Sequence, residues 1–289
     1  MILNASGCLD ALTAADVAGE LDAFVTKTVT PRPRAGNEPV RIAETEVGML
    51  NSIGLANPGI DSFRQDVLPC LAKLDLPIWV SVGAFSADDY ADLCRQLDEE
   101  PVVEAVELNL SCPNVAEPVG SVAEIVAAAR EATSKKLYAK LSAAGGDVGS
   151  VAVAAAEAGA DGLSLVNTIR GLALDPQTLA PTLSTATGGL SGPALRPIAL
   201  AAVFVCFKAT GLPIVGMGGI ETGRHALQLI AAGASVCALG TVLFSDPEAP
   251  GRIRSELAAE AEALGFGNPL DAHAVAHGNE APAPLRRVA

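Results

Sequence analysis

Aromatic residues are scarce in this sequence, at 3% of 289 residues, whereas hydrophobic residues make up half of it. A core of this size must therefore be built mainly from alanine, valine, leucine and isoleucine. This composition is typical of parallel sheets that helices cover on both faces, because such sheets are apolar on each side. It favours an α/β protein, and a single (β/α) barrel of about 250 residues fits the length.

Positive charge is also scarce. The sequence has 19 lysines and arginines against 33 aspartates and glutamates, which gives a formal net charge of −14. A surface that binds nucleic acid needs clustered cations, and the sequence contains no basic run. We therefore expect no nucleic-acid partner, although a local site can still bind a small anion.

Paired cysteines are missing. The six cysteines form no Cys-x-x-Cys pair and no Cys/His group with the spacing of a zinc site. Isolated thiols are typical of reduced cytosolic proteins, so we expect a cytoplasmic protein without a bound metal. Cys112 is the candidate for chemistry, and the others are interpreted as core or surface thiols: Cys8, Cys70, Cys94, Cys206 and Cys237.

Long apolar segments are missing as well. The N-terminus has no basic segment followed by an apolar stretch, and no window reaches about 20 uninterrupted apolar residues. The longest candidate, residues 198–207, is predicted to be a helix buried against a sheet. We therefore expect no association with a membrane.

Short apolar runs alternate with alanine-rich segments of helical period along almost the entire chain, which indicates a parallel sheet. Eight such units predict a (β/α)8 TIM barrel over residues 1–264, followed by an irregular tail over residues 265–289. The predicted strands are residues 2–5, 23–27, 78–82, 105–110, 137–141, 162–166, 214–217 and 236–239. The predicted helices include residues 62–74, 87–99, 122–133, 148–158, 195–210, 223–232 and 251–264.

Two insertions lengthen this pattern. Residues 28–61 follow the second predicted strand, and residues 168–194 follow the sixth. Loops this long in a compact domain are usually functional. The sequence therefore predicts a barrel with long loops after strands two and six.

Polar side chains follow the predicted strands, at the end of a TIM barrel where chemistry takes place. Residues 107–114 read Glu-Leu-Asn-Leu-Ser-Cys-Pro-Asn, so that Cys112 lies between Asn109 and Asn114. A thiol beside two amides is suited to act as a base next to a polar ring. Lys27 and Lys140 lie at other strand ends and indicate a carboxylate or a reduced flavin ring as their counter-charge.

Glycine runs occupy the loops after the last three strands, at residues 188–192, 216–219 and 240–241. TIM barrels commonly bind phosphate at these loops through exposed backbone N–H groups. One Gly-Gly pair is also ordinary turn chemistry. Runs at all three expected loops predict a phosphate site.

These segments together resemble the class 1 dihydroorotate dehydrogenases over residues 4–246. The most specific are Lys-Thr-Val-Thr at 27–30, Asn-Ser-Ile-Gly-Leu at 51–55, Asn-Pro-Gly at 57–59, Asn-Leu-Ser-Cys-Pro-Asn at 109–114, Val-Asn-Thr at 166–168 and Gly-Leu-Ser-Gly-Pro at 189–193. The resemblance implies a TIM barrel that binds FMN and oxidises (S)-dihydroorotate to orotate in pyrimidine biosynthesis.

The resemblance also implies roles for individual residues. Cys112 would be the base that takes the C5 proton while the C6 hydride moves to flavin N5, and Lys27 would also be catalytic. The substrate would contact Lys27, Asn51, Ser52, Ile53, Gly54, Leu55, Asn109, Asn114, Asn167 and Thr168. The cofactor would contact Ser6, Lys27, Thr28, Ser81, Asn109, Lys140, Val166, Gly192, Gly218, Gly219, Gly240 and Thr241, with Lys140 beside flavin N1.

Two features place the chain within the family. The quinone-linked class 2 enzymes have serine in the place of Cys112, so this thiol favours class 1. Ile-Gly-Leu at 53–55 with Asn-Pro-Gly at 57–59 is more similar to the NAD-linked 1B form than to the fumarate-linked 1A form. The 1B form implies a partner subunit that carries FAD and a [2Fe-2S] cluster, and we also expect a homodimer.

The chain departs from the family pattern in three places. Family members usually have some twenty residues before the segment that begins here at Asn4, which bears on barrel closure and stability. Ser81 stands where an asparagine near the flavin is common. A hydroxyl replaces one of the two hydrogen bonds of an amide but not both, so we expect the free energy of FMN binding to be weaker by about 1 kcal/mol. Residues 143–146 replace a usual Pro-Asn.

Two alternatives remain open at this point. One is a related flavin-dependent oxidoreductase of dihydropyrimidine or uracil-type rings, which the asparagine at position 114 disfavours because the nearest of these enzymes tend to have histidine there. The other is a noncatalytic flavin-binding barrel. The three histidines, His225, His273 and His277, are assigned no role.

Overall fold

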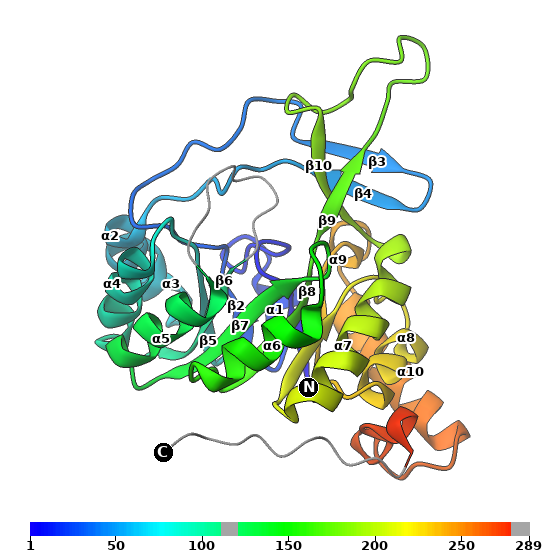
Figure 1. The fold of residues 1–289 in the computed structure, drawn as a ribbon. Coiled ribbons are helices and arrows are strands. Elements are labelled where there is room, and N and C mark those ends of the chain that lie inside the picture. Colours follow the sequence, from blue (N-terminus) through cyan, green and yellow to red (C-terminus); the bar gives the residue numbers. More distant parts are fainter. Residues whose placement is uncertain (111–120, 279–289) are drawn as a thin grey trace.

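The computed structural model describes residues 1–110 and 121–278 of the chain. Its central element is an eight-stranded parallel sheet in the order β1-β12-β11-β8-β7-β6-β5-β2, which helices surround (Figure 1). Each strand matches a predicted one, so the predicted (β/α)8 barrel is confirmed. The strands are β1 (Ile2–Asn4), β2 (Phe24–Val25), β5 (Ile78–Val82), β6 (Val103–Asn109), β7 (Lys136–Ser142), β8 (Gly162–Asn167), β11 (Ile214–Met217) and β12 (Val236–Leu239).

The barrel closes where β1 meets β2, and a side chain does much of the pairing there. The main-chain contact is a parallel bridge between Leu3 and Ala23. Beside it, the fully buried amide of Asn4 donates to the Val25 carbonyl at 2.7 Å and accepts from the Val25 N–H at 2.8 Å. This amide satisfies both backbone groups of Val25, as a further ladder pair would. The Asn4 side chain therefore completes the pairing at the seam between β1 and β2.

Helices cover the outside of the barrel. Several begin at a residue whose side chain accepts a hydrogen bond from the first turn, namely Ser86, Ser121, Asp147 and Thr222. The helices are α1 (Ala15–Gly19), α2 (Ile60–Ser62), the π turn η1 (Phe63–Val67), α3 (Leu68–Leu71), α4 (Ala87–Asp98), α5 (Val122–Ala132), α6 (Val148–Glu157), the 3₁₀ turn η2 (Pro193–Leu195), α7 (Arg196–Thr210), α8 (Gly223–Ala231), α9 (Val242–Ser245) and α10 (Ala249–Ala263).

The barrel interior is filled mainly by small and branched side chains, as the low aromatic content requires. Its one stacked aromatic pair in the described chain is Trp79 with Tyr138, whose ring centroids lie 4.5 Å apart. Both residues belong to the early part of their strands, β5 and β7. The interior is thereby plugged at the N-terminal end of the strands, and space remains at the C-terminal end. The other buried members of this cluster are Leu3, Ala23, Val25, Ala105, Val215, Met217 and Ala238.

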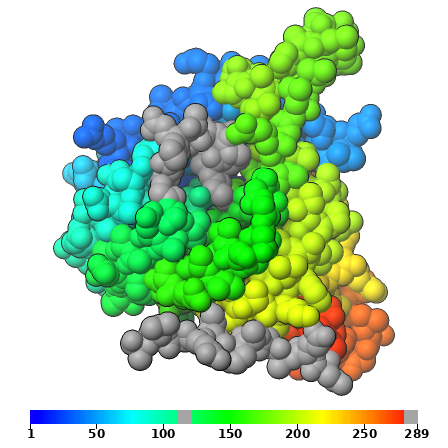
Figure 2. Space-filling model, viewed as in Figure 1, coloured from blue at the N-terminus to red at the C-terminus, as the bar shows by residue number. Residues whose placement is uncertain are grey.

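The two insertions combine into one antiparallel sheet, here called the insertion sheet. It contains β3 (Ile42–Thr45) and β4 (Gly48–Asn51) from the first insertion and β9 (Ile169–Leu172) and β10 (Thr187–Ser191) from the second, in the order β3-β4-β10-β9. The register pairs Asn51 with Gly189. The long excursion between β9 and β10 projects from the body of the molecule (Figures 1 and 2). The insertions are thus partly sheet, which the prediction of long loops did not include.

The tail is ordered as far as it is described. Residues 269–277 contain two 3₁₀ helices, η3 (Pro269–Ala272) and η4 (Val275–His277). The His277 ring stacks on Phe204 of α7 with a centroid distance of 4.0 Å, and His273 Nε2 lies 3.1 Å from the Gly233 carbonyl. These two histidines therefore hold the start of the tail against α7 and the end of α8, a structural role that the sequence did not indicate.

Residues Pro193–Thr210 have the length and apolar composition of a helix that crosses a membrane. Within the fold, α7 buries one face, including Ala199, Val203 and Cys206, and contacts β8 and β11. Its apolar character is therefore explained by packing against the barrel, as predicted for residues 198–207.

Candidate active site

A cavity of about 350 Å³ opens at the C-terminal ends of the barrel strands, where the insertion sheet adjoins them. Its wall combines backbone from the loops after the barrel strands with side chains from β3 and β4. Most of the predicted site residues line this cavity: Ser6, Lys27, Thr28, Asn51, Ile53, Leu55, Asn109, Lys140, Val166, Asn167, Thr168, Gly192, Gly218, Gly219, Gly240 and Thr241. The fold therefore brings residues from the ends of seven barrel strands, all but β5, and from both insertions to one place.

The other predicted residues that the structure describes do not line the cavity. Ser52 is buried and accepts hydrogen bonds from Asn37 Nδ2 at 2.7 Å and Thr185 Oγ1 at 2.6 Å, so it ties the two insertions together. Gly54 adopts a left-handed φ of 72°, and a Cβ there would lie 2.5 Å from Asn37 Oδ1. Cys112 and Asn114 lie outside the described residues.

Ser81 is the remaining predicted residue that the cavity wall does not include. It is fully buried on β5, and its Oγ lies 3.1 Å from Thr28 Oγ1. The hydroxyl therefore reaches the cavity through Thr28, which does line it. Ser81 would therefore affect a ligand in the cavity indirectly, because it helps to orient the Thr28 hydroxyl that faces the ligand.

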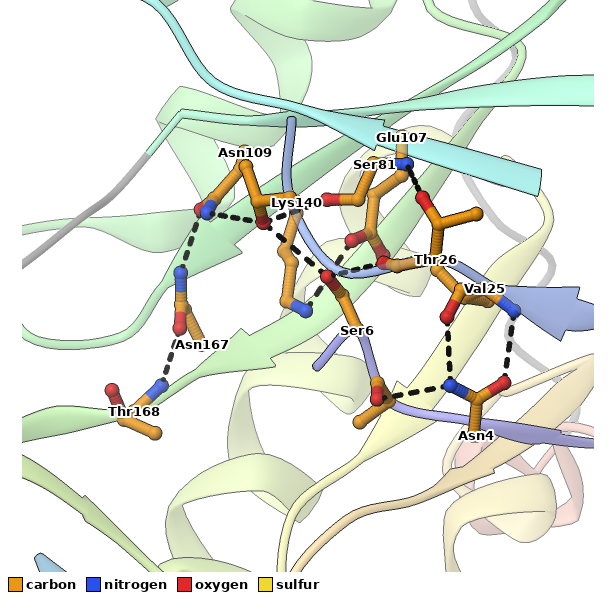
Figure 3. A network of polar contacts seen from close by, with 12 residues as sticks. Asn4, Ser6, Val25, Thr26, Ser81, Glu107, Asn109, Lys140, Asn167 and Thr168 are labelled. Carbon is orange, nitrogen blue, oxygen red and sulfur yellow. Dashed lines mark hydrogen bonds and ion pairs between the residues drawn. The ribbon is translucent and has the colours of Figure 1, made fainter. Parts of the chain in front are cut away.

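A chain of hydrogen bonds connects the polar side chains of the cavity wall (Figure 3). Asn109 Nδ2 donates to Thr28 Oγ1 at 3.3 Å, and Asn167 Nδ2 donates to Asn109 Oδ1 at 2.9 Å. Asn167 Oδ1 in turn accepts from the Thr168 N–H at 2.9 Å. Each amide is thus held in one orientation by its neighbours, which is the arrangement needed to read the edge of a polar ring.

The end of β6 that carries Asn109 is fixed from outside the barrel. The Tyr90 hydroxyl of α4 donates to the Asn109 carbonyl at 2.7 Å. Tyr90 is itself buried. This contact holds the last residue of the strand just before the segment that contains Cys112.

Two lysines bring positive charge to the cavity of a strongly acidic chain. Lys140 of β7 is only 6% exposed, and its Nζ lies 3.4 Å from Oε1 of Glu107 on β6, which is 1% exposed. Lys27 packs over Gly7, where a Cβ would come within 2.8 Å of its Cδ. With two cations and one anion, this part of the wall carries a local net charge of about +1 and is suited to an anionic ligand.

The cavity also contains residues that the sequence did not single out. Cys8 lines it, and burial raises the pKa of this thiol although Lys140 and Lys27 oppose the rise. Glu107 could have been noticed, because it lies two residues before Asn109 and the period of a strand places both side chains on one face. The further lining residues include Ile42, Met49, Ser191, Glu221 and Phe244.

The glycine loops form the other end of the cavity. Gly218 and Gly219 have φ values of 125° and 71°, which L side chains rarely adopt. Within the described residues, the N–H groups of Gly219, Gly240 and Thr241 donate to no protein acceptor. Unpaired N–H groups on a left-handed turn form an anion site, so this end fits a phosphate.

A polar contact lies behind the glycine turn. His225 Nδ1 of α8 accepts from the Glu221 N–H at 3.2 Å and lies 3.1 Å from Arg196 Nη1 of α7. Because Nδ1 accepts in both contacts, the ring is neutral. Burial, followed by the Arg196 charge, lowers the pKa of His225 from 6.5. This histidine, which the sequence did not implicate, braces the loop that contains Gly218 and Gly219.

Comparisons with known proteins agree with this geometry. The family model described as dihydroorotate dehydrogenase matches residues 1–260. A protein from Desulforudis audaxviator, the catalytic subunit of dihydroorotate dehydrogenase B (NAD(+)), is 45% identical over 250 residues, which are 84% of this chain and 81% of that protein. The subunit of the same description from Listeria monocytogenes is 40% identical over 261 residues, 87% and 85% of the two chains.

A solved structure shares the fold. The crystal structure of DHODH from Eimeria tenella in complex with ferulenol superimposes with a TM-score of 0.79, over 96% of this chain and 85% of that one. The two sequences are 24% identical. This likeness supports the barrel fold of the chain.

Proposed function

This chain belongs to the dihydroorotate dehydrogenase family, and from that premise we propose that it is the FMN-dependent catalytic subunit of an NAD-linked, class 1B enzyme. Its reaction is the oxidation of (S)-dihydroorotate to orotate in pyrimidine biosynthesis. The observation that carries the proposal is the cavity, because residues from both insertions and most barrel loops converge there with the chemistry that this reaction needs.

The cavity fits FMN at both ends. The glycine turn and the N–H groups of Gly240 and Thr241 would hold the phosphate, and Ser6, Thr28 and Lys140 would face the ring. The cradle has room for a ligand because a Cβ at Gly240 would meet no atom closer than 3.7 Å. When bound, FMN supplies the acceptor for the hydride from C6 of the substrate.

The protein would hold the substrate and move its proton. Asn51, Asn109 and Asn167 would hydrogen-bond the pyrimidine edge. The amides of Asn109 and Asn167 are oriented by the chain of hydrogen bonds in the wall, and that of Asn51 donates to the Gly189 carbonyl at 3.4 Å. Lys27 would pair with the carboxylate of the substrate. Cys112, outside the described residues, is proposed as the base for the C5 proton, because a thiolate is a stronger base in a site without water than it is in water.

The electron acceptor and the partners follow from the relatives. Both are named as catalytic subunits of an NAD(+) enzyme, so we propose that this chain passes electrons to NAD through a partner subunit. That partner would carry FAD and a [2Fe-2S] cluster. We further propose that the chain forms a homodimer and works in the cytoplasm.

Anaerobic addition of dihydroorotate to the FMN-loaded protein tests the proposed reaction. We expect the absorbance of the oxidised flavin to disappear. Dihydrouracil, which has the same ring without the carboxylate, is the matched control and should leave the absorbance unchanged. Failure to bind FMN, or equal reduction by both compounds, would show that the proposed reaction is wrong.

A second experiment addresses the partner. The chain is expressed in its native host with an affinity tag, and the bound material is examined for FAD, iron and acid-labile sulfide. We expect all three to be recovered with the chain. Recovery of the chain with FMN alone would contradict the NAD-linked assignment.

A further inference from the structure

Glu107 is a carboxylate inside the barrel, which is an unusual place for a charge. It is 1% exposed and lies on β6 two residues before Asn109. Its side chain points inward toward Lys140 (Figure 3), whose Nζ is 3.4 Å from Oε1. Neither the family-derived roles nor the proposed function uses this residue.

The fold does not need a charge at this position. Burying an ion pair removes two charges from water, and a well-packed apolar pair of similar volume is often as stable or more stable. Other interior positions nearby are apolar, such as Ala105 on the same strand and Val25 on β2, and the one polar residue in register with Glu107 on β5, Ser81, is uncharged. A buried pair beside a ligand cavity therefore indicates a role toward the ligand.

The pair lies close to the reactive end of the cavity. Asn109 is in register with Lys140 across β6 and β7. The charges of Lys140, Lys27 and Glu107 all act on the thiol of Cys8 in the cavity wall. Lys140 lines the cavity, whereas Glu107 lies behind it. Glu107 can therefore act on a ligand through Lys140 and through its own field.

We infer that Glu107 is a positioning residue, which holds the Lys140 ammonium group at the ring of FMN and offsets its charge so that the bound cofactor has a low reduction potential. The inference rests on the proposed function. With Glu107 the two lysines leave a local charge of about +1, and without it the charge would be about +2. Extra positive charge favours the reduced ring because reduction adds negative charge to it.

A low potential suits the reaction that the chain is proposed to serve. Dihydroorotate loses two electrons and two protons to become orotate, and NAD+ takes two electrons and one proton, so that one proton is released. FMN stands between dihydroorotate and NAD+ in this transfer. Electrons reach NAD+ only when the reduced FMN gives them up readily. A carboxylate behind Lys140 would serve this purpose, because it limits how strongly the wall stabilises added negative charge.

The test compares the potential of FMN bound to the native chain and to Glu107→Gln, measured by equilibration with redox dyes at constant pH. The glutamine keeps an oxygen that accepts from Lys140 Nζ and removes only the charge. We expect the ratio of reduced to oxidised cofactor at a fixed ambient potential to rise about tenfold, which is about 30 mV for a two-electron couple. Glu104→Gln is the control, because this exposed residue of β6 loses the same charge and should leave the potential unchanged.

An unchanged potential in Glu107→Gln that still binds FMN would overturn the inference and leave the proposed function intact. Failure of the native chain to bind FMN would overturn both. If Glu107→Gln does not fold, Glu107→Asp replaces it, and its carboxylate, one methylene farther from Lys140, should produce a smaller rise in the same direction. If neither variant folds, Glu107 is a structural residue and the inference is wrong.

Discussion

Thr28 has three side-chain contacts through a single hydroxyl group. Thr28 Oγ1 lies 3.3 Å from Ser6 Oγ and 3.1 Å from Ser81 Oγ, and it accepts from Asn109 Nδ2 at 3.3 Å. Thr28 is 2% exposed and Ser81 is fully buried, so water does not readily replace the contact between these two hydroxyls. One hydroxyl thus couples strands β2, β5 and β6 at the wall of the cavity, and the loss of a buried partner costs more than the bond itself contributes.

Thr28→Val should therefore weaken FMN binding by about 1 to 3 kcal/mol, or roughly 5- to 150-fold in Kd. The side chain keeps its shape, but Asn109 Nδ2 and Ser81 Oγ lose their partner. Titration of apoprotein with FMN, followed by flavin fluorescence, measures the change. Thr13→Val, at an exposed position, is the control. Equal Kd values for both variants would contradict a role of the hydroxyl in the site.

Cys112→Ser should slow the reduction of FMN by dihydroorotate strongly near neutral pH. The serine hydroxyl ionises at far higher pH than the thiol, so little deprotonated base is present near neutral pH and part of the rate should return as the pH rises. Anaerobic stopped-flow measurement of the flavin absorbance between pH 6 and 10 checks this. A rate equal to that of the native chain throughout would remove Cys112 from the mechanism.

Among the elements, the turn between β11 and α8 depends on a neutral histidine. His225 can accept from the Glu221 N–H and from Arg196 only while Nδ1 is unprotonated. Burial and Arg196 favour that form, whereas Glu221 and Glu256 oppose them. The lowered pKa of His225 means that the folded state binds the proton less readily than the unfolded state does. The stabilisation is complete above pH 6.5 and is lost as the pH falls through the lower pKa of the folded state.

His225→Gln should therefore reduce the loss of thermal stability and of FMN retention between pH 7 and pH 5. The glutamine does not titrate, so the brace no longer changes with pH. Melting temperatures across this range measure the effect, and flavin release is recorded in parallel. His273→Gln, which alters the tail instead, should keep the native dependence on pH. The same pH dependence in native and His225→Gln protein would show that another group is responsible.

The elements also show what the sequence could and could not predict. Strands β11 and β12 were predicted to the residue, because each is a short apolar run between clear helix and turn signals. Strands β3, β4, β9 and β10 were not, since each has four or five residues and the pairing that joins them into one sheet, that of β4 with β10, brings Asn51 to Gly189, more than a hundred residues away. The polar wall residues were predicted individually. Which of these residues hydrogen-bond to one another, and that Lys140 pairs with Glu107, depends on the register of neighbouring barrel strands, and no local sequence pattern contains that register.

Across the whole molecule, stability depends on closure of the barrel at one seam. β1 and β2 share a single main-chain bridge, and Asn4 supplies the other contacts through its side chain. Nearby, Asp22 accepts from the Ile2 N–H at 2.6 Å and contacts Arg254 of α10 at 3.0 Å. The first strand is thus tied to both its neighbour and the last long helix.

Asn4→Ala should destabilise the protein by about 3 kcal/mol, because it leaves the N–H and carbonyl of Val25 buried without partners. The melting temperature should fall by roughly 6 to 12 °C. Urea unfolding followed by circular dichroism measures the change in free energy. Gln177→Ala removes an exposed amide and should have little effect. A loss of under 0.5 kcal/mol in Asn4→Ala would show that the bridge between Leu3 and Ala23 suffices.

The insertion sheet has a consequence for how the cavity comes into existence. Met49 and Ser191 reach the cavity from β4 and β10, which pair with each other only when both insertions are in place. Pairing over such separations is slow, since the chain between the strands must first be ordered. During synthesis, then, the first half of the barrel can emerge and collapse while the pocket still has no cover. Ligand binding should be acquired last, after release of the second insertion and of β11 and β12 from the ribosome, and a chain interrupted before β10 should have the six earlier barrel strands but neither the cover of the pocket nor its glycine loops.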